Sequence, residues 1–349
     1  MSDKILKKSE IGLLLDRLRS EYRTYAPARQ GTSVDWKPLD RAEDLCWTFG
    51  NTDMSPKKFF FPQTERLMHF NNDPEAPEGR AMQPESERDF RQALIGIRPC
   101  DAKAFRILDR VFGKAESARD PYWQEKREKA LLIGLACKDP HPSCFCTSMQ
   151  CGPHHREGLD VLMTDLDDQV LLTGLTDKGE ALIAEFADAP ADLLEQAEEQ
   201  KQEAEKPIGA VANLDNIGAK DLLELYEAGI WDRINEPCLT CGTCTFYCPV
   251  CHCFDIQDET QGTYGHRIRN WDTCMSRLFT LHTSGHNPRG TKKDRVRQRF
   301  MHKFKYMPMK LEGSAGCVGC GRCVQRCPVN LDVREVIDQM GRAVCPEPV

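Results

Sequence analysis

The chain has 349 residues, with 47 Lys and Arg against 54 Asp and Glu, and a formal net charge of −7. This length suits about two domains, and the mild acidity argues against a protein dedicated to binding nucleic acid. Hydrophobic residues make up 40% of the chain and charged residues 29%, which is typical of a soluble globular protein, and no apolar run is long enough to span a membrane.

The N-terminal part predicts a mixture of helices and short strands. Residues 1–8 lack the apolar segment of a secretory signal. Residues 94–97 form an apolar run that predicts a buried strand, and Asp101 can cap the helix that follows it. Ser9 is placed to cap a helix whose apolar residues recur at helical spacing, namely Ile11, Leu14, Leu15 and Leu18.

The elements after residue 130 continue this mixture. Residues 131–136 predict a second buried strand, and residues 161–173 predict a hairpin that turns at two aspartates. Three helices are expected at 178–187, 191–205 and 220–228, the second of them polar and facing solvent. Because strands and helices do not alternate regularly, we predict an α+β fold for this part.

The 18 cysteines divide the chain in two. In a chain without a secretory signal we expect a reducing compartment, here the cytoplasm, where cysteines serve as metal ligands or redox thiols. Residues 1–235, the α+β domain, carry few cysteines, whereas residues 236–349 are organised around theirs.

Two segments of this second part share the spacing C-x2-C-x2-C-x3-C-P, which is typical of ferredoxins with two 4Fe–4S clusters. Three thiolates two residues apart wrap one cluster, glycines between them permit the tight loop, and the fourth thiolate reaches the other cluster. Zinc fits poorly, because a zinc ribbon needs only two C-x2-C pairs. We predict one cluster on Cys238, Cys241, Cys244 and Cys327, and a second on Cys317, Cys320, Cys323 and Cys248.

Residues 249–316 separate the two motifs, far more than the link of a compact ferredoxin. Arg267, Trp271 and residues 278–281 indicate helices in this insertion. We therefore predict a mainly α-helical, ferredoxin-like two-cluster domain over 236–349.

Ten cysteines lie outside the motifs, and some of them form C-x-C pairs. A third 4Fe–4S cluster could assemble across the domain boundary on Cys144, Cys146, Cys253 and Cys274, with Cys251, Cys137 or Cys100 as substitutes for one of them. The alternative is that these cysteines are small buried hydrophobic residues. Cys46 and Cys345 are interpreted as structural, Cys151 has no assigned role, and the histidines next to cysteines, His154, His155 and His252, are expected to be exposed.

A basic segment runs from His266 to Lys310, with twelve Lys or Arg against two acidic residues. It could bind nucleic acid, compensate the negative charge of thiolate-bound clusters, or dock an acidic partner. Its place between two cluster motifs favours the second and third interpretations.

No phosphate-binding loop, dinucleotide fingerprint or nucleophile elbow occurs in the sequence. The chain therefore carries electron carriers without a recognisable site for a nicotinamide, a flavin or a substrate. This combination predicts one subunit of a larger oxidoreductase, with no catalytic residues of its own.

Several motifs together resemble the family of sulfhydrogenase beta subunits and anaerobic sulfite reductase subunits A. They are the segments that begin at Gly96, Cys144, Cys251, Arg269 and Gly285, and the inner part of the second cluster motif, 318–323. The resemblance extends from about residue 95 to residue 344. It implies a dicluster electron-transfer subunit, and it strengthens the cysteines of the two C-x-C pairs and Cys274 as ligands.

The resemblance also implies partners, namely a flavin subunit that takes electrons from NAD(P)H and a terminal redox subunit. The terminal subunit could be a nickel–iron hydrogenase, a sulfite reductase or a heterodisulfide-reductase-type protein. The alternatives are a stand-alone catalyst with Cys100 or Cys151 as a reactive thiol, and an iron–sulfur regulator that binds nucleic acid.

Overall fold

The computed structural model describes residues 2–76, 80–85, 91–113, 119–211 and 214–343. Its largest element is an eight-stranded sheet in the order β10-β1-β9-β8-β7-β6-β2-β3. These strands are β1 (Asp3–Lys7), β2 (Tyr22–Gln30), β3 (Ser33–Pro38), β6 (Arg91–Ile97), β7 (Ala130–Leu135), β8 (Val161–Leu166), β9 (Gln169–Gly174) and β10 (Ala187–Asp188).

The centre of this sheet is parallel and its flanks are antiparallel. Strands β2, β6, β7 and β8 pair in parallel, while β3, β9, β1 and β10 extend the sheet with antiparallel pairs. The predicted strands at 94–97 and 131–136 are thus neighbours in the parallel centre, and the predicted hairpin at 161–173 is β8 and β9. Because parallel strands run in one direction, their carboxyl ends meet at one edge of the sheet.

Helices cover both faces of the sheet, because alternate residues of each strand face opposite sides. On one face pack α1 (Ile11–Arg19) and α4 (Asp177–Ile183), and on the other α2 (Pro99–Gly113) and α3 (Pro121–Glu128). The predicted apolar face of α1 is buried.

Two predicted helix caps are wrong. Glu10 precedes α1, after a short 3-10 turn that contains Ser9. Helix α2 begins at Pro99, so Asp101 lies in its first turn, where it forms a buried ion pair instead of a cap.

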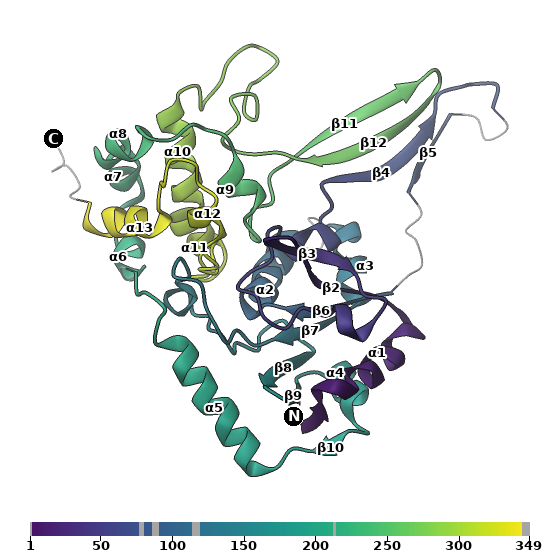
Figure 1. Cartoon of the computed structure of the whole chain (residues 1–349). Helices are drawn as coiled ribbons and strands as arrows, with labels where there is room; N and C mark the ends of the chain where they lie inside the picture. The colour runs from purple at the N-terminus through teal and green to yellow at the C-terminus, as the bar shows by residue number, and fades with distance from the viewer. Residues whose placement is uncertain (1, 77–79, 86–90, 114–118, 212–213, 344–349) are drawn as a thin grey trace.

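Helix α5 (Ala191–Glu205) packs against β8 and β9 and leads towards a group of helices that contains the C-terminal part of the chain (Figure 1). Only Ala197 and Ala204 are buried along it, which confirms the predicted solvent-facing helix. The helices of the second group are α6 (Asp215–Gly218), α7 (Leu222–Glu227), α8 (Ile230–Asn235), α9 (Thr243–Phe246), α10 (Lys292–Met301), α11 (Met307–Lys310), α12 (Arg322–Gln325) and α13 (Val333–Arg342).

A second, four-stranded sheet projects from the molecule (Figure 1). It joins β11 (Phe254–Gln261) and β12 (Tyr264–Trp271) to β4 (Thr64–Asn71) and β5 (Ala81–Pro84), so its strands come from both sides of the predicted boundary at residue 235. Buried Arg269 on β12 forms ion pairs with Glu65 on β4 and with Asp120.

This sheet corrects the expectation of helices throughout the insertion. Arg267 and Trp271 lie on strand β12, and residues 278–281 lie in turns and bends. The segment 254–271 can form strands because β4 supplies a partner from a distant part of the sequence. The cysteine-rich part is therefore a set of short helices with an added hairpin.

Candidate iron–sulfur centres

The two cysteine motifs form loops of the same backbone shape. We call residues 238–248 the outer loop and residues 317–327 the inner loop. In the outer loop Thr240 and Gly242 have φ values of 54° and 77°, and at the same positions of the inner loop Gly319 and Gly321 have φ values of 67° and 74°. Two left-handed residues in three positions turn the chain back on itself, which brings the flanking cysteines to one side.

Backbone N–H groups near these turns donate to cysteine sulfur. Thr240 N lies 3.4 Å from Cys238 Sγ, and Gly319 N lies 3.4 Å from Cys317 Sγ. Leu331 N lies 3.2 Å from the sulfur of Cys327. Such donors stabilise a thiolate, and hydrogen bonds to sulfur are among the factors that set the reduction potentials of iron–sulfur clusters.

The first predicted set of four cysteines surrounds one cavity. This cavity is also lined by Cys323 of the inner loop and by the side chains of Arg299 and Phe300. Although the first three cysteines and the fourth are more than 80 positions apart in the sequence, the fold brings them together. The cysteines concerned are Cys238, Cys241, Cys244 and Cys327.

The second predicted set gathers around Cys248. Cys248 and Cys320 belong to one cluster of buried side chains, and burial together with the neighbouring Cys248 raises the pKa of Cys317, Cys320 and Cys323. Lys303 Nζ donates to Cys248 Sγ at 3.2 Å.

The inner loop is fastened to the N-terminal part by buried polar contacts. Arg322 donates from both terminal nitrogens to Asp101, at 2.6 and 2.8 Å, and from Nε to the carbonyl of Thr52 at 2.9 Å. Asn51 Nδ2 donates to the carbonyl of Cys320 at 2.7 Å. Because Arg322 and Asp101 are both almost fully buried, each depends on the other to balance its charge.

Buried cations accompany the cysteines. Arg299 and Lys303 are 4% and 5% exposed; although burial opposes their charged forms, nearby cysteines raise the pKa of both side chains. Arg299 Nη1 is buried without a hydrogen-bond partner among the described residues, and Arg299 lines the first cavity. A buried donor without a partner is costly, so this side chain fits a site that receives an anionic, thiolate-bound group.

The cysteine geometry fits a polynuclear cluster better than a single metal ion. Within the described residues, no group of three or more His, Cys, Asp or Glu side chains has the arrangement of a single-ion site. The first set of four cysteines surrounds a cavity instead of one point, and four thiolates around a cavity suit a 4Fe–4S cluster.

The predicted third ligand set is not brought together. Cys144 and Cys146 line a cavity in the N-terminal part with Cys100 and Cys137. The physical reason is that residues 143–146 pack on the backbone of the inner loop, where a Cβ on Gly319 would lie 2.5 Å from Cys146 Cα.

The other two members of that set lie at the base of the β11–β12 hairpin. Cys253 and Cys274 line a different cavity, together with Cys251 and Lys303. The thiol of Cys274 donates to Cys253, and together with nearby lysines this hydrogen bond lowers the pKa of Cys253 to about 6. Cys251, which lines the same cavity, forms a hydrogen bond with Cys248. Through Cys251, this cavity therefore adjoins the second predicted cluster.

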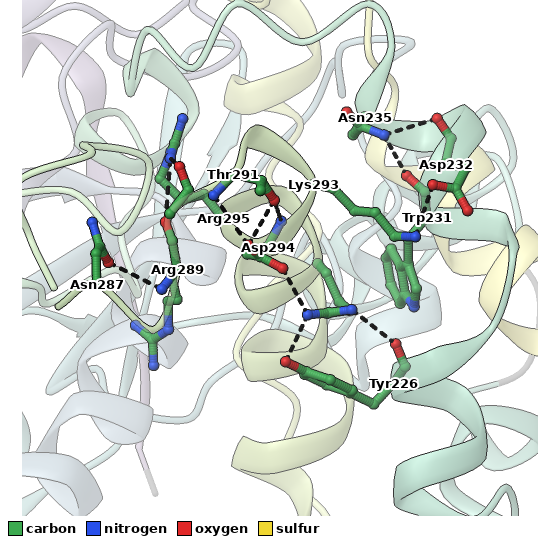
Figure 2. Close-up of polar contacts among 12 residues, drawn as sticks. Tyr226, Trp231, Asp232, Asn235, Asn287, Arg289, Thr291, Lys293, Asp294 and Arg295 are labelled. Atoms are coloured by element: carbon green, nitrogen blue, oxygen red, sulfur yellow. Dashed lines mark hydrogen bonds and ion pairs between the residues drawn. The ribbon is translucent and has the colours of Figure 1, made fainter.

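The basic segment is largely engaged within the protein. Thr291 and Asp294 cap α10 reciprocally, Lys293 pairs with Asp232 at 2.7 Å, and Arg295 donates to the carbonyl of Arg289 at 3.2 Å (Figure 2). Four further cations of the segment are buried, namely Arg269, Arg299, Lys303 and Lys305. The contacts of Arg299 and Lys303 with cysteines support the charge-compensation interpretation.

The remaining residues singled out by sequence have simpler environments. Cys46 is partly buried and its thiol donates to the carbonyl of Thr48 at 3.5 Å, and Cys345 lies outside the described residues. The expectation of exposed histidines is wrong for His154, His155 and His252, which are all partly buried. Burial lowers the pKa of His154 to about 4.

Comparisons with known proteins agree with this geometry. Residues 237–331 match the family model of a 4Fe–4S dicluster domain. The chain is 29% identical to sulfhydrogenase 2 subunit beta of Pyrococcus furiosus over 329 residues, which covers 93% of this chain and 94% of the relative. No solved structure matches the chain.

The predicted resemblance to sulfhydrogenase beta subunits is thus confirmed, and the chain is an iron–sulfur protein with a C-terminal 4Fe–4S dicluster domain. In the described part of the chain, no helix is both long and apolar enough to cross a membrane.

Proposed function

We propose that this chain is the iron–sulfur electron-transfer subunit of a multisubunit oxidoreductase. It exchanges electrons between a partner flavin subunit that oxidises NAD(P)H and a terminal redox subunit. A sulfite reductase or a heterodisulfide-reductase-type protein could be the terminal subunit, but the similarity to a sulfhydrogenase subunit favours a hydrogenase.

The observation that carries this proposal is the arrangement of the two sets of four cysteines as adjacent centres. Cys323, a predicted ligand of the second set, also lines the cavity of the first set, so the two sites adjoin. When bound, 4Fe–4S clusters supply reversible one-electron transfer. The first site is close to the surface, because Cys241 is exposed and Leu239 is 62% exposed. A partner could therefore dock against the outer loop.

The protein contributes charge balance and sulfur hydrogen bonds. Lys303 donates to Cys248 Sγ, and Arg299 is placed among cysteines of both sets. Positive charge near a cluster favours its reduced, more negative state. These side chains therefore help to set the reduction potentials of both centres.

The rival proposal of a thiol catalyst finds little support. Burial raises the pKa of Cys100 well above its usual value and that of Cys151 to about 12. A reactive cysteine needs a thiolate at neutral pH, so neither residue is a good nucleophile as a free thiol. A nucleic-acid regulator is disfavoured because the basic segment is engaged in contacts within the chain.

The two parts of the chain, residues 1–235 and 236–349, have different roles in this arrangement of the cysteines. Residues 236–349 supply all eight predicted ligands of the two clusters, and residues 1–235 supply Asn51 and Asp101, which bind the inner loop. A reducing cytoplasm suits cysteines that must remain available as ligands, and none of the described cysteines forms a disulfide.

The test uses protein purified without oxygen, alone and with the subunits that co-purify with it. Alone, we expect at least about eight irons per chain, electron paramagnetic resonance (EPR) signals after reduction by dithionite, and no turnover with NADH or NADPH. Turnover should require the flavin partner. Turnover by the chain alone, or salt-sensitive binding to nucleic acid, would contradict the proposal.

Cys320→Ala tests the ligand assignment. We expect a loss of about four irons per chain and a less stable C-terminal part, because the cluster contributes to folding. Cys46→Ala is the matched control and should keep its iron, since Cys46 lies outside the described cavities. Unchanged iron in Cys320→Ala would show that Cys320 is not a ligand.

A further inference from the structure

A third cysteine-lined cavity lies at the carboxyl edge of the parallel strands. Strands β6 and β7 are neighbours, with Ile97 paired to Gly134 near their ends. Cys100 follows β6 by three residues and Cys137 follows β7 by two, and both line this cavity. The carboxyl edge of parallel strands is where α/β folds bind their ligands.

The C-x-C segment completes the cavity. Residues 138–146 turn back after β7, so that Cys144 and Cys146 face the same space as Cys100 and Cys137. Phe145 N donates to the carbonyl of Gly319 at 2.9 Å, which holds the segment against the inner loop. Four cysteines from three separate segments thus converge outside the matched dicluster domain.

A buried cation lines the same cavity and has no anionic partner in the part of the chain that the structure describes. Arg98 is 4% exposed, and its guanidinium donates to the carbonyls of Gly50, Leu135, Ala136 and Phe49. Every hydrogen-bond partner of this guanidinium among the described residues is a neutral carbonyl. Arginine stays protonated in proteins, and a buried charge without a counter-charge is strongly unfavourable.

The start of α2 adds positive potential from another direction. This helix has 15 residues and begins at Pro99, and both Pro99 and Cys100 line the cavity. Helix N-termini carry a partial positive charge that favours anions. Asp101 in the first turn of α2 is paired with Arg322, so four neutral thiols would leave Arg98 without a negative charge, whereas thiolates bound to a cluster would supply one.

We propose that Cys100, Cys137, Cys144 and Cys146 bind a third iron–sulfur cluster of the 4Fe–4S class. This inference deepens the proposed electron-transfer function and rests on it for the role of the site. Each cysteine ligates iron as a thiolate and releases its thiol proton on binding.

The inner loop separates this site from the outer one. Cys320 lines the third cavity, and Cys144 Sγ donates to the carbonyl of Cys320 at 3.8 Å. The three sites therefore form a series, in which the second predicted cluster lies between the first cluster and the third site. The third site extends the series into the N-terminal part, so that electrons can enter at one end and leave at the other.

The experiment compares iron, zinc and acid-labile sulfide in the anaerobically purified full chain and two variants. Cys146→Ala should lose about four irons per chain relative to wild type, together with one EPR component, and keep the signals of the other clusters. Cys151→Ala is the matched control, because Cys151 lies in the same segment, with its N–H bonded to Cys146 O at 3.1 Å, but does not line the cavity. It should keep all its iron.

Three results would overturn the proposal. They are wild-type protein with only about eight irons, unchanged iron in Cys146→Ala, and zinc that is lost in Cys146→Ala. The wild-type count decides even where the variant does not fold. Cys320→Ala keeps the two proposals distinguishable: if it loses iron and Cys146→Ala does not, the electron-transfer function stands and the third cluster fails.

Discussion

The outer and inner loops share a cysteine spacing and a backbone shape but differ in their surroundings. In the outer loop Cys241 is exposed, and its Sγ donates to Thr243 Oγ1 at 3.3 Å. In the inner loop Cys320 is 8% exposed. Arg322, which occupies the position of Thr243, is bound to Asp101 across the boundary. The same local motif therefore forms one centre near the surface and one centre inside the protein.

This difference shows that the motif specifies the geometry of the ligands, whereas the rest of the fold decides whether a partner protein can approach the centre. An exposed centre can exchange electrons with a docked partner. A buried centre can exchange them only with its neighbours. We therefore expect substitutions at equivalent loop positions to have unequal effects.

The largest expected effect comes from Arg322→Met. This change leaves Asp101 as a buried carboxylate without its partner, and we expect a loss of about 3–5 kcal/mol in stability. The measurement is anaerobic thermal unfolding. Thr243→Met, the same change at the outer position, should cost less than about 1 kcal/mol. Equal losses of stability in the two variants would mean that contacts with the rest of the protein stabilise the two loops equally.

The next effect comes from Gly319→Ala. Gly319 has a φ of 67°, and a Cβ there would lie 2.5 Å from the backbone N and Cα of Cys146. The left-handed backbone alone costs about 1–3 kcal/mol for an ordinary residue. The clash should also separate the C-x-C segment from the inner loop.

Thr240→Ala is the control for Gly319→Ala, because Thr240 already holds a side chain at a φ of 54°. It should change stability by no more than about 0.5 kcal/mol. Unfolding monitored by circular dichroism and by cluster absorbance would measure both variants. A stable Gly319→Ala protein would argue that the two segments do not pack closely.

Lys303→Met tests the charge at the inner centre. The variant removes the Nζ donor at 3.2 Å from Cys248 Sγ, so the reduced and more negative state loses stabilisation. We expect the reduction potential of one cluster to fall by on the order of 60 mV, a tenfold change in a one-electron equilibrium. Redox titration followed by EPR measures it.

Lys303→Arg keeps the positive charge and should recover most of the potential. The first predicted cluster should shift less than the second, because Lys303 acts on Cys244 only through its charge and does not line the first cavity. A shift of equal size in the reduction potentials of both clusters would contradict the assignment of Lys303 to the second cluster.

The smallest expected effect comes from Leu239→Ser. Leu239 is 62% exposed beside Cys238, so we expect it to contact the partner that docks on the outer loop. The loss should be about 1 kcal/mol of binding free energy, with iron content unchanged. Leu13→Ser on α1, at 53% exposed, is the control, and titration calorimetry with the co-purified subunit is the measurement. Equal affinity in the two variants would place docking elsewhere.

Local spacing in the sequence predicted both sets of four cysteines, because cluster motifs hold their first three ligands within a few residues. The apolar runs at 94–97 and 131–136 predicted buried strands, and these are β6 and β7. The hairpin at 254–271 was missed, because its strands are stabilised by pairing with β4, about 190 positions earlier in the sequence.

The third cavity depends on contacts that local sequence patterns do not specify. The sequence pairs Cys144 and Cys146 with Cys253 and Cys274, whereas in the structure they line a cavity with Cys100 and Cys137. The signal that could have found Cys100 and Cys137 is that each follows a buried strand. This signal brings the two cysteines together only if β6 and β7 are parallel neighbours, and that pairing joins segments far apart in the sequence.

The sequence by itself determined the chemistry of this protein: cysteine-ligated clusters, loops shaped by left-handed residues, and no recognisable site for a nicotinamide or a flavin. Only the tertiary structure decided which cysteines share a cavity, which centre is buried, and where Arg98, Arg299 and Lys303 place their charges. The physical reason is that thiolate motifs are local, whereas burial and charge balance depend on segments far apart in the chain.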